Sequence, residues 1–298
     1  MNLVMERPSA LTAPNQLVEI GSRTLAYRRF GSGPEMVLCT RLRGTMDMWD
    51  PLFLDNLAAH FTVTVFDYSG LGFSTGTPSY AKADMARDVD DLVTALGLGT
   101  IIIGGWSLGG FAAQVFAAIH PEKVSHVLAI ATMPPGLMVK ASEPLFFEVA
   151  TKLEYSAADE HILFFEPASA KSRALGDASL ARIAARQDVW DKPTPPETMN
   201  AAMWASNDPT TPFPDTDGRL AAFFETTDIP VLALCGDHDL VFPVENWYAL
   251  NDRWPTLFVA TYPECGHGPQ HQYPEMAADL IASFVLNSGH GLVSTEAN

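Results

Sequence analysis

Two short segments of the 298-residue chain hold a serine in the pattern Gly-x-Ser-x-Gly. One is Gly105–Gly109, which is centred on Ser107, and the other is Gly72–Gly76, which is centred on Ser74. A serine in this pattern can attack an acyl group when a tight turn between a strand and a helix presents it. The two segments therefore have to be separated by what surrounds them.

The surroundings favour Ser107 as the nucleophile. The apolar run 101–103 precedes it, and a helical pattern follows over Gly110–His120. Glycines on both sides let the strand and the helix approach closely, and the N-terminus of the helix faces the negative charge that develops during attack. Ser74 is followed instead by TGTPSY, a polar loop with a proline, so we interpret this segment as a structural turn.

A nucleophilic serine needs a base, and the base needs an acid to orient it. Candidates follow two strand-like runs in the last third of the chain: Asp239 after Ile229–Cys235, and His267 after Leu257–Thr261. The loops at the ends of parallel strands meet at one edge of a sheet. Asp237 is the alternative acid, although an aspartate there can also cap a turn.

No metal and no cofactor are expected. His271 lies four residues after His267, which is a spacing that can hold zinc on a helix. Gly268 and Pro269 between them argue against such a helix. The cysteines lack metal-type spacing and are expected to be buried or free thiols in a reducing compartment. They are Cys39, Cys235 and Cys265.

The pattern along the chain predicts an α/β fold with a mostly parallel, twisted sheet and helices on both faces. The expected strands are Gln16–Ile20, Thr24–Phe30, Met36–Cys39, Phe61–Phe66, Thr100–Ile103, Val124–Ala131, Ile229–Cys235 and Leu257–Thr261. The expected helices are Pro51–His60, Tyr80–Leu96, Gly110–His120 and Pro274–Leu286.

One long region interrupts this alternation. Residues 134–224 show helical patterns and prolines but no convincing strand, which is too long for an ordinary connection. We interpret it as a helical cap inserted into a core made of residues 15–133 and 225–287. The ends, 1–14 and 288–298, are expected to be flexible.

Charge and hydropathy restrict the partners. The net charge of −17 and a pI near 4.7 disfavour nucleic acid and anionic membrane surfaces. No apolar run reaches the length of a membrane span, and the N-terminal residues lack the apolar stretch of a signal peptide. A cytoplasmic protein with a small-molecule substrate is expected, and its oligomeric state is left open.

Several motifs together resemble the α/β-hydrolase superfamily, in particular its serine hydrolases with an inserted helical cap. They are FDYSGLGFS, GGWSLGG, GDHDLVFP and CGHGPQHQYPE. The resemblance implies that Ser107 is the nucleophile, His267 the base and Asp239 the orienting acid. It also disfavours haloalkane dehalogenase and epoxide hydrolase chemistry, because those relatives have an aspartate at the position of Ser107.

The loop after the strand at 36–39 departs from that family. It reads CTRLRGT, so Thr40 and Arg41 replace the usual His-Gly pair. By the resemblance, Leu42 supplies one backbone N–H of the oxyanion hole and Leu108 supplies the other.

The two arginines of this loop need their own explanation. We expect Arg41 or Arg43 to brace the loop through an ion pair with a core acid such as Asp47 or Asp50. Contact with the substrate is the less favoured alternative.

The cap region is rich in large apolar side chains, which suits an apolar cleft above the serine. The predicted substrate contacts are Trp106, Phe146, Phe147 and Trp204. The favoured substrate is an apolar ester or lactone. A bulky macrolactone, as a resemblance to macrolide esterases implies, is a further option. That last option is the minority one.

The same triad serves other chemistries, and these stay open. They are hydrolysis of a C–C bond, a haloperoxidase-like perhydrolase reaction, and removal of an N-terminal proline with Glu148 or Glu154 binding the amine. A different class is a receptor-like ligand-binding protein with slow turnover, because this fold also hosts receptors.

Overall fold

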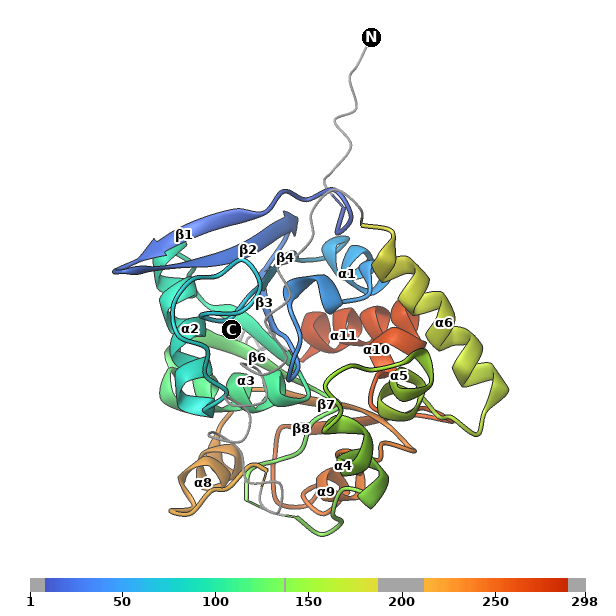
Figure 1. The fold of residues 1–298 in the computed structure, drawn as a ribbon. Coiled ribbons are helices and arrows are strands. Elements are labelled where there is room, and N and C mark those ends of the chain that lie inside the picture. The colour runs from blue at the N-terminus through green and yellow to red at the C-terminus, as the bar shows by residue number, and fades with distance from the viewer. Residues whose placement is uncertain (1–8, 137, 187–211, 289–298) are drawn as a thin grey trace, which may run out of the picture.

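The computed structural model describes residues 9–136, 138–186 and 212–288. In this part of the chain eight strands form one sheet in the order β1-β2-β4-β3-β5-β6-β7-β8 (Figure 1). Strands β1, β2 and β4 pair antiparallel, and all other neighbours pair parallel. The strands are β1 Gln16–Ile20, β2 Arg23–Gly31, β3 Glu35–Cys39, β4 Thr62–Phe66, β5 Ile101–Trp106, β6 Val124–Ile130, β7 Val231–Gly236 and β8 Leu257–Tyr262.

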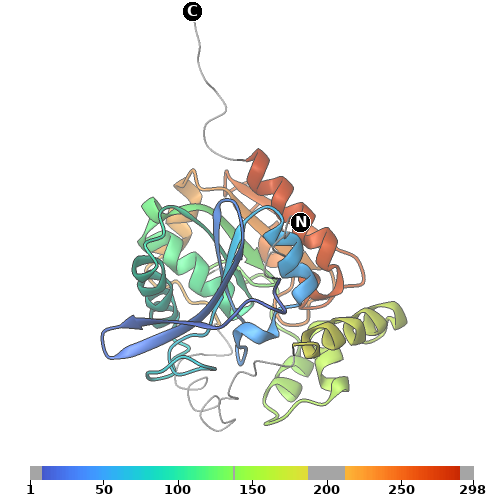
Figure 2. The ribbon, with the colours of Figure 1, turned by 90° about the horizontal axis from the view of Figure 1, so that it is seen from above.

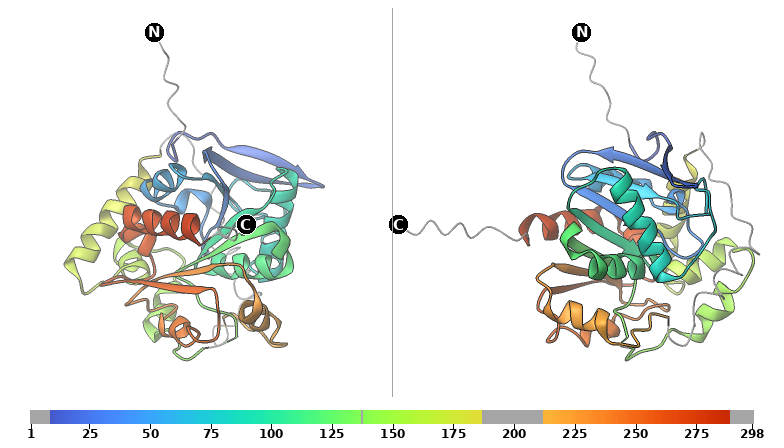
Figure 3. Two further views of the ribbon diagram at one scale, coloured as in Figure 1. Left: turned by 180° about the vertical axis from the view of Figure 1, so that it is seen from behind. Right: turned by 90° about the vertical axis from the view of Figure 1, so that its left-hand side faces the viewer.

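Helices cover both faces of this sheet. Helices α2 and α3 pack on one face, and α1 and α11 lie against each other on the opposite face, as the view from behind shows (Figure 3). The helices are α1 Pro51–Ala58, α2 Lys82–Ala95, α3 Leu108–Ile119, α4 Pro144–Ala150, α5 Ala157–Phe164, α6 Ala170–Ala184, α8 Arg219–Thr226, α9 Glu245–Tyr248, α10 Pro269–Gln272 and α11 Pro274–Asn287. The predicted α/β fold class, a mostly parallel sheet with helices on both faces, is confirmed.

The apolar strands explain this two-sided packing. Along β5, Ile101 and Ile103 enter the core beneath α2 and α3, whereas Ile102 enters the core beneath α1 and α11. All six residues of β5 are buried. A strand with apolar side chains on both faces is stable only when both faces are covered.

The strand ends gather the loops that carry the candidate site. Trp106 at the end of β5 pairs with Ile130 of β6, and Gly236 at the end of β7 pairs with Tyr262 of β8. The loops that follow β5, β7 and β8 therefore emerge at the same edge of the sheet.

Two element boundaries differ from the expected ones for the same reason. Strand β5 runs to Trp106 rather than Ile103, and α3 begins at Leu108 rather than Gly110. Ser107 alone lies between the strand and the helix, so the turn is as short as the motif allows.

Within the predicted cap region, 134–224, the described residues form α4, α5 and α6, which lie together at one end of the molecule (Figure 2). The boundary predicted at 224 falls inside α8, and α8 packs against α3 of the core. Division into core and cap stays a prediction, since residues 187–211 lie outside the described part.

The expected flexible N-terminal end begins to be ordered earlier than residue 15. Ala10 donates its N–H to Asp55, and the carbonyls of Ala10 and Ala13 accept hydrogen bonds from Arg186. These contacts tie the segment to α1 and to the residues just after α6. Residues 1–8 and 289–298 lie outside the described part. No helix among the described residues is both long and apolar enough to cross a bilayer.

Candidate active site

Ser107 occupies a strained turn between β5 and α3. Its backbone has φ 57° and ψ −122°, a region that residues other than glycine rarely adopt. The N–H of Ser107 donates to the carbonyl of Ile130 at 2.9 Å, and its own carbonyl accepts from Gly110. These bonds hold the turn in place, so the side chain stands at the end of β5.

The glycines around Ser107 are required by space. A Cβ atom on Gly105 would lie 2.1 Å from the carbonyl oxygen of Gly109. A Cβ on Gly109 would lie 2.2 Å from the carbonyl oxygen of Cys39. Both contacts are with backbone, which cannot move aside cheaply, so the close approach of α3 to β5 and β3 depends on these glycines.

A chain of hydrogen bonds joins the serine, the histidine and the aspartate that the sequence singles out. His267 Nε2 lies 2.8 Å from Ser107 Oγ, and His267 Nδ1 lies 2.8 Å from Asp239 Oδ2. The three residues are nearly enclosed, with exposures of 7%, 2% and 4% for Ser107, His267 and Asp239. This geometry allows the imidazole to accept the hydroxyl proton while the carboxylate orients the ring.

The structure separates the two candidate acids. The other oxygen of Asp239 accepts the backbone N–H groups of Val241 and Phe242, at 2.7 and 2.9 Å, which fixes the carboxylate toward His267. Asp237 accepts the N–H of Cys265 at 3.0 Å instead. Asp237 therefore braces the turn that carries the histidine and does not contact the ring of His267.

Ser74 is a structural residue. Its hydroxyl donates to the carbonyl of Asp67 at 2.6 Å and accepts the N–H of Ala26 at 2.9 Å. It thereby continues the pairing between β2 and β4 beyond the end of the ladder. The turn predicted for this segment is present.

The two expected oxyanion donors lie on the segments that flank Ser107. Leu108 is the first residue of α3, so its N–H has no acceptor within the helix. Leu42 lies in a turn closed by the Gly44 N–H to the Arg41 carbonyl at 3.1 Å. In that turn Arg43 has φ 58°, and its N–H donates to the hydroxyl of Tyr80. The role of either N–H in catalysis stays a prediction.

The expected ion pairs of the two loop arginines are not formed, and this prediction was wrong. Arg43 reaches outward to the carbonyls of Ala150, Lys152 and Leu153, at the end of α4. Arg41 donates to the carbonyl of Leu42 at 2.9 Å. The loop is braced by carbonyl oxygens because the core acids bind other arginines.

Those core acids are already paired with arginines elsewhere. Asp47 pairs with Arg28, and Asp50 pairs with Arg182 of α6 at 2.6 Å. Asp50 also caps α1 through the N–H of Leu52 and accepts the hydroxyl of Ser179. These bonds fasten α6 to the core.

His271 lies next to this cluster rather than beside His267. Its Nδ1 is 3.1 Å from Ser179 Oγ, and its ring lies 4.5 Å from that of Trp106. Burial lowers the pKa of His271 to about 4, so the ring is neutral at pH 7. The described residues hold no group of three or more His, Cys, Asp and Glu side chains that could bind a metal ion.

The predicted substrate contacts fall in different places. Trp106 is 2% exposed and donates its indole N–H to the carbonyl of His267 at 2.7 Å, so it lies in the core. Phe146 and Phe147 of α4 are partly buried and pack edge to face. Trp204 lies outside the described residues. Contact of these side chains with a substrate stays a prediction.

The three cysteines are buried, free thiols. Burial raises the pKa of Cys39 to about 12, and it raises the pKa values of Cys235 and Cys265 as well. Raised pKa values make these thiols poor nucleophiles.

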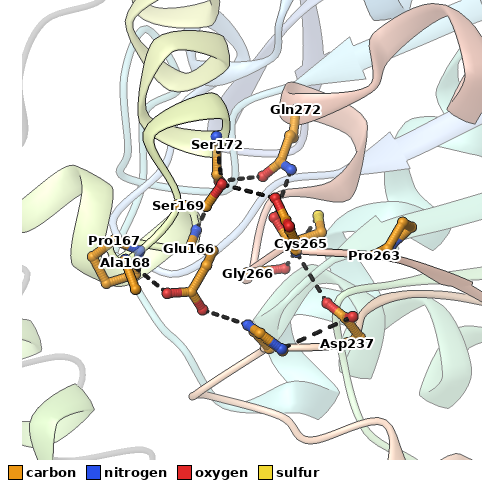
Figure 4. A network of polar contacts seen from close by, with 12 residues as sticks. Glu166, Pro167, Ala168, Ser169, Ser172, Asp237, Pro263, Cys265, Gly266 and Gln272 are labelled. Atoms are coloured by element: carbon orange, nitrogen blue, oxygen red, sulfur yellow. Dashed lines mark hydrogen bonds and ion pairs between the residues drawn. The ribbon is translucent and has the colours of Figure 1, made fainter.

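A polar network joins the predicted cap region to the loops of His267 and Asp239 (Figure 4). Ser172 of α6 donates to Gln272 at 2.6 Å, and Gln272 donates to the carbonyl of Glu264 at 2.7 Å. Glu166, between α5 and α6, lies 2.6 Å from Nδ1 of His238. Nothing in the sequence around His238 indicates this contact, because its partner Glu166 lies 72 residues away in the chain.

The contact between His238 and Glu166 predicts a pH-dependent contribution to stability. The pKa of His238 is raised, chiefly by its hydrogen bond to Glu166, with added contributions from the charges of Asp237 and Glu264. The protonated ring therefore stabilises the fold. This stabilisation is fully present below the pKa of the unfolded chain, about 6.5, and it is lost as the pH rises through the higher pKa of the folded protein. The side chain is half exposed, so the effect is small.

We therefore expect His238→Gln to lower the melting temperature at pH 5.5 more than at pH 9. Differential scanning calorimetry of both chains across this range measures the difference. A difference that stays constant with pH would show that the pair contributes no charge-dependent stability.

Comparison with known proteins places the chain in a family. The profile of the alpha/beta hydrolase fold matches residues 34–274, so the chain belongs to this family. Among curated proteins it is 24% identical to the pimeloyl-[acyl-carrier protein] methyl ester esterase of Nitrosospira multiformis, over 89% of this chain and 99% of that one. It is 26% identical to the protein of the same name from Pectobacterium carotovorum, over 88% and 98%.

Solved structures agree on the fold. An alpha/beta hydrolase fold protein from Chitinophaga pinensis superposes with a TM-score of 0.79 at 27% identity, covering 93% of this chain and 98% of the other. An esterase from a Rhodococcus species gives 0.72 at 21% identity, over 93% and 99%. A meta-cleavage product hydrolase from Pseudomonas fluorescens gives 0.74 at 17% identity, over 92% and 98%. The last two show the fold alone.

Proposed function

We propose that the chain is a serine hydrolase that cleaves a carboxylic ester or lactone. Ser107 attacks the carbonyl carbon, His267 takes the hydroxyl proton, and Asp239 holds the imidazole. The single observation that carries the proposal is the pair of 2.8 Å contacts that His267 makes with Ser107 and Asp239. The names of the curated relatives, which describe ester hydrolysis, support the same class.

The reaction proceeds in two halves through an acyl-enzyme. In the first, the proton held by His267 passes to the leaving alcohol as the C–O bond breaks. In the second, His267 activates a water molecule, which releases the acid and restores the serine. The N–H groups of Leu108 and Leu42 are the proposed donors to the oxyanion, and the loss of one such donor costs about 3 kcal/mol in other enzymes.

The other reactions on the same triad receive less support. Glu148 and Glu154, the candidate amine binders of a proline-releasing enzyme, are both exposed to solvent. For hydrolysis of a C–C bond no contact of the described residues argues, and the meta-cleavage product hydrolase shares the fold at only 17% identity, which carries no argument about the reaction. A receptor-like protein with slow turnover would need no serine hydrogen-bonded to a histidine. The contact between Ser107 and His267 therefore favours an enzyme over such a receptor.

A panel of substrates tests the proposal. Short and long acyl esters, small lactones, macrolide lactones, a C–C diketone and a prolyl amide are incubated with the protein and with Ser107→Ala. Mass spectrometry then scores each for the gain of one water. Turnover of an ester or lactone that depends on Ser107 is expected. Turnover of the diketone or the amide alone would overturn the proposal in favour of the corresponding rival.

A further inference from the structure

Arg41, beside the candidate oxyanion donor Leu42, carries a buried charge that the proposed mechanism does not use. Its side chain is 7% exposed. Within the described part of the chain no carboxylate lies at ion-pair distance from it, and its Nε has no hydrogen-bond acceptor. Among the described residues, the one hydrogen bond of its side chain goes to the neutral carbonyl of Leu42.

The other deeply buried arginines in the described residues behave differently. Arg28 pairs with Asp47, and Arg186 lies 3.7 Å from the same carboxylate. A buried charge loses several kcal/mol of hydration unless an opposite charge compensates for it. Among the arginines that the structure describes as buried, Arg41 is therefore the exception, since no described carboxylate supplies its counter-charge.

Two aromatic contacts place the Arg41 guanidinium one ring away from the candidate base. Its guanidinium carbon lies 5.2 Å from the ring centre of Trp106, the residue immediately before Ser107. It lies 4.5 Å from the ring centre of Phe164 on α5, and that ring stacks on His267 at 6.2 Å. One aromatic ring thus separates the charge from the candidate base.

The surroundings compensate for only part of the hydration energy that the buried guanidinium loses. Cation–π contacts are weaker than the hydration that a guanidinium loses. Burial lowers the pKa of Arg41, and the field of Glu160 on α5 opposes that effect without an ion pair. An arginine nevertheless keeps its charge. The net charge of −17 repels anions in general, so an anionic substrate would need such a local cation.

We propose that Arg41 binds a carboxylate of the substrate, so that the ester cleaved at Ser107 carries a second, anionic group on its acyl side. This inference rests on the proposed function and narrows its substrate class from carboxylic esters and lactones in general to half-esters of diacids. The planar guanidinium suits a carboxylate because it can donate two parallel hydrogen bonds.

Matched ester pairs test the inference. The pairs are monomethyl succinate with methyl butanoate, monomethyl glutarate with methyl pentanoate, and monomethyl adipate with methyl hexanoate. Members of a pair differ only in a carboxylate that replaces a methyl group. In at least one pair we expect kcat/KM to favour the half-ester by roughly 10- to 100-fold, as a hydrogen-bonded ion pair does.

Variants show whether Arg41 causes this preference. Arg41→Met is expected to bring the ratio within a pair to about one, and Arg41→Lys to keep part of it. Arg43→Met is the matched control, because Arg43 lies in the same loop but binds carbonyl oxygens. Its ratio should equal that of the unchanged chain. A preference that survives Arg41→Met would overturn the inference.

Binding separates this inference from the proposed function. Calorimetry of Ser107→Ala with each ester needs no turnover, so it decides the question even if no ester is cleaved. Binding of a half-ester at least tenfold tighter than its neutral partner, lost in Ser107→Ala/Arg41→Met, supports the inference. Equal binding of the half-ester and its neutral partner in every pair overturns the inference. This comparison needs only Ser107→Ala, so it holds even if Arg41→Met fails to fold. An arginine that serves only packing predicts no preference for the half-ester.

Discussion

Ser107→Ala is expected to lower kcat for the preferred ester by a factor on the order of 10⁴ to 10⁶ while the protein stays folded. The substitution removes the oxygen that His267 polarises at 2.8 Å and leaves the other bonds of the turn, which are backbone bonds. The measurement is steady-state kinetics of both chains, with circular dichroism to verify the fold. A variant that keeps a tenth of the activity would rule out Ser107 as the nucleophile.

Ser74→Ala is the matched control for that experiment. It makes the same Ser→Ala change in the other Gly-x-Ser-x-Gly segment, where the hydroxyl makes hydrogen bonds to the backbone and does not contact His267. Because the hydroxyl satisfies Ala26 and Asp67 inside the fold, we expect a loss of about 1–3 kcal/mol of stability. Its kcat should stay close to that of the unchanged chain below the melting transition.

Gly109→Ala is expected to destabilise the fold by more than about 4 kcal/mol and to abolish activity. Helix propensity alone predicts the opposite, a gain of up to about 1 kcal/mol, since Gly109 lies in the first turn of α3. The new Cβ would stand 2.2 and 2.5 Å from the carbonyl oxygens of Cys39 and Thr40. To relieve that overlap, α3 must move away from β3 and the turn of Ser107 must open. Urea unfolding monitored by fluorescence measures the effect.

Gly99→Ala gives the corresponding control. A Cβ there meets nothing within 4 Å, and the backbone of Gly99 is not left-handed. Its free energy of unfolding should change by less than about 0.5 kcal/mol. If Gly109→Ala proved equally mild, the close packing of α3 against β3 would not be what holds the serine turn.

The sequence predicts the parts of the site that depend on local pattern. The turn at Ser107 is indicated by a buried strand before it, glycines on both sides and a helix after it. The sequence alone therefore favours Ser107 over Ser74 as the candidate nucleophile. The positions of Asp239 and His267 after successive strands follow from the parallel order of the sheet. The choice between Asp239 and Asp237 does not, because both precede the same turn and only the direction of each carboxylate distinguishes them.

Contacts between distant segments could not be predicted in this way. Asp50 and Arg182 are separated by 132 residues, and nothing near either one indicates the other. The expected ion pair of a loop arginine with a core acid such as Asp47 or Asp50 did not form, because those acids already bind Arg28 and Arg182. The carbonyls that Arg43 binds are invisible in a sequence, since every residue has one.

The most direct test of the central claim is to find which residue a serine-directed fluorophosphonate labels. The protein is treated with the probe, digested, and its peptides are mapped by mass spectrometry. One adduct on the peptide that holds Ser107, absent from Ser107→Ala and weakened when Asp239→Asn misorients His267, is the expected result. An adduct on Ser74, or ester turnover with Ser107 unlabelled, would contradict the account.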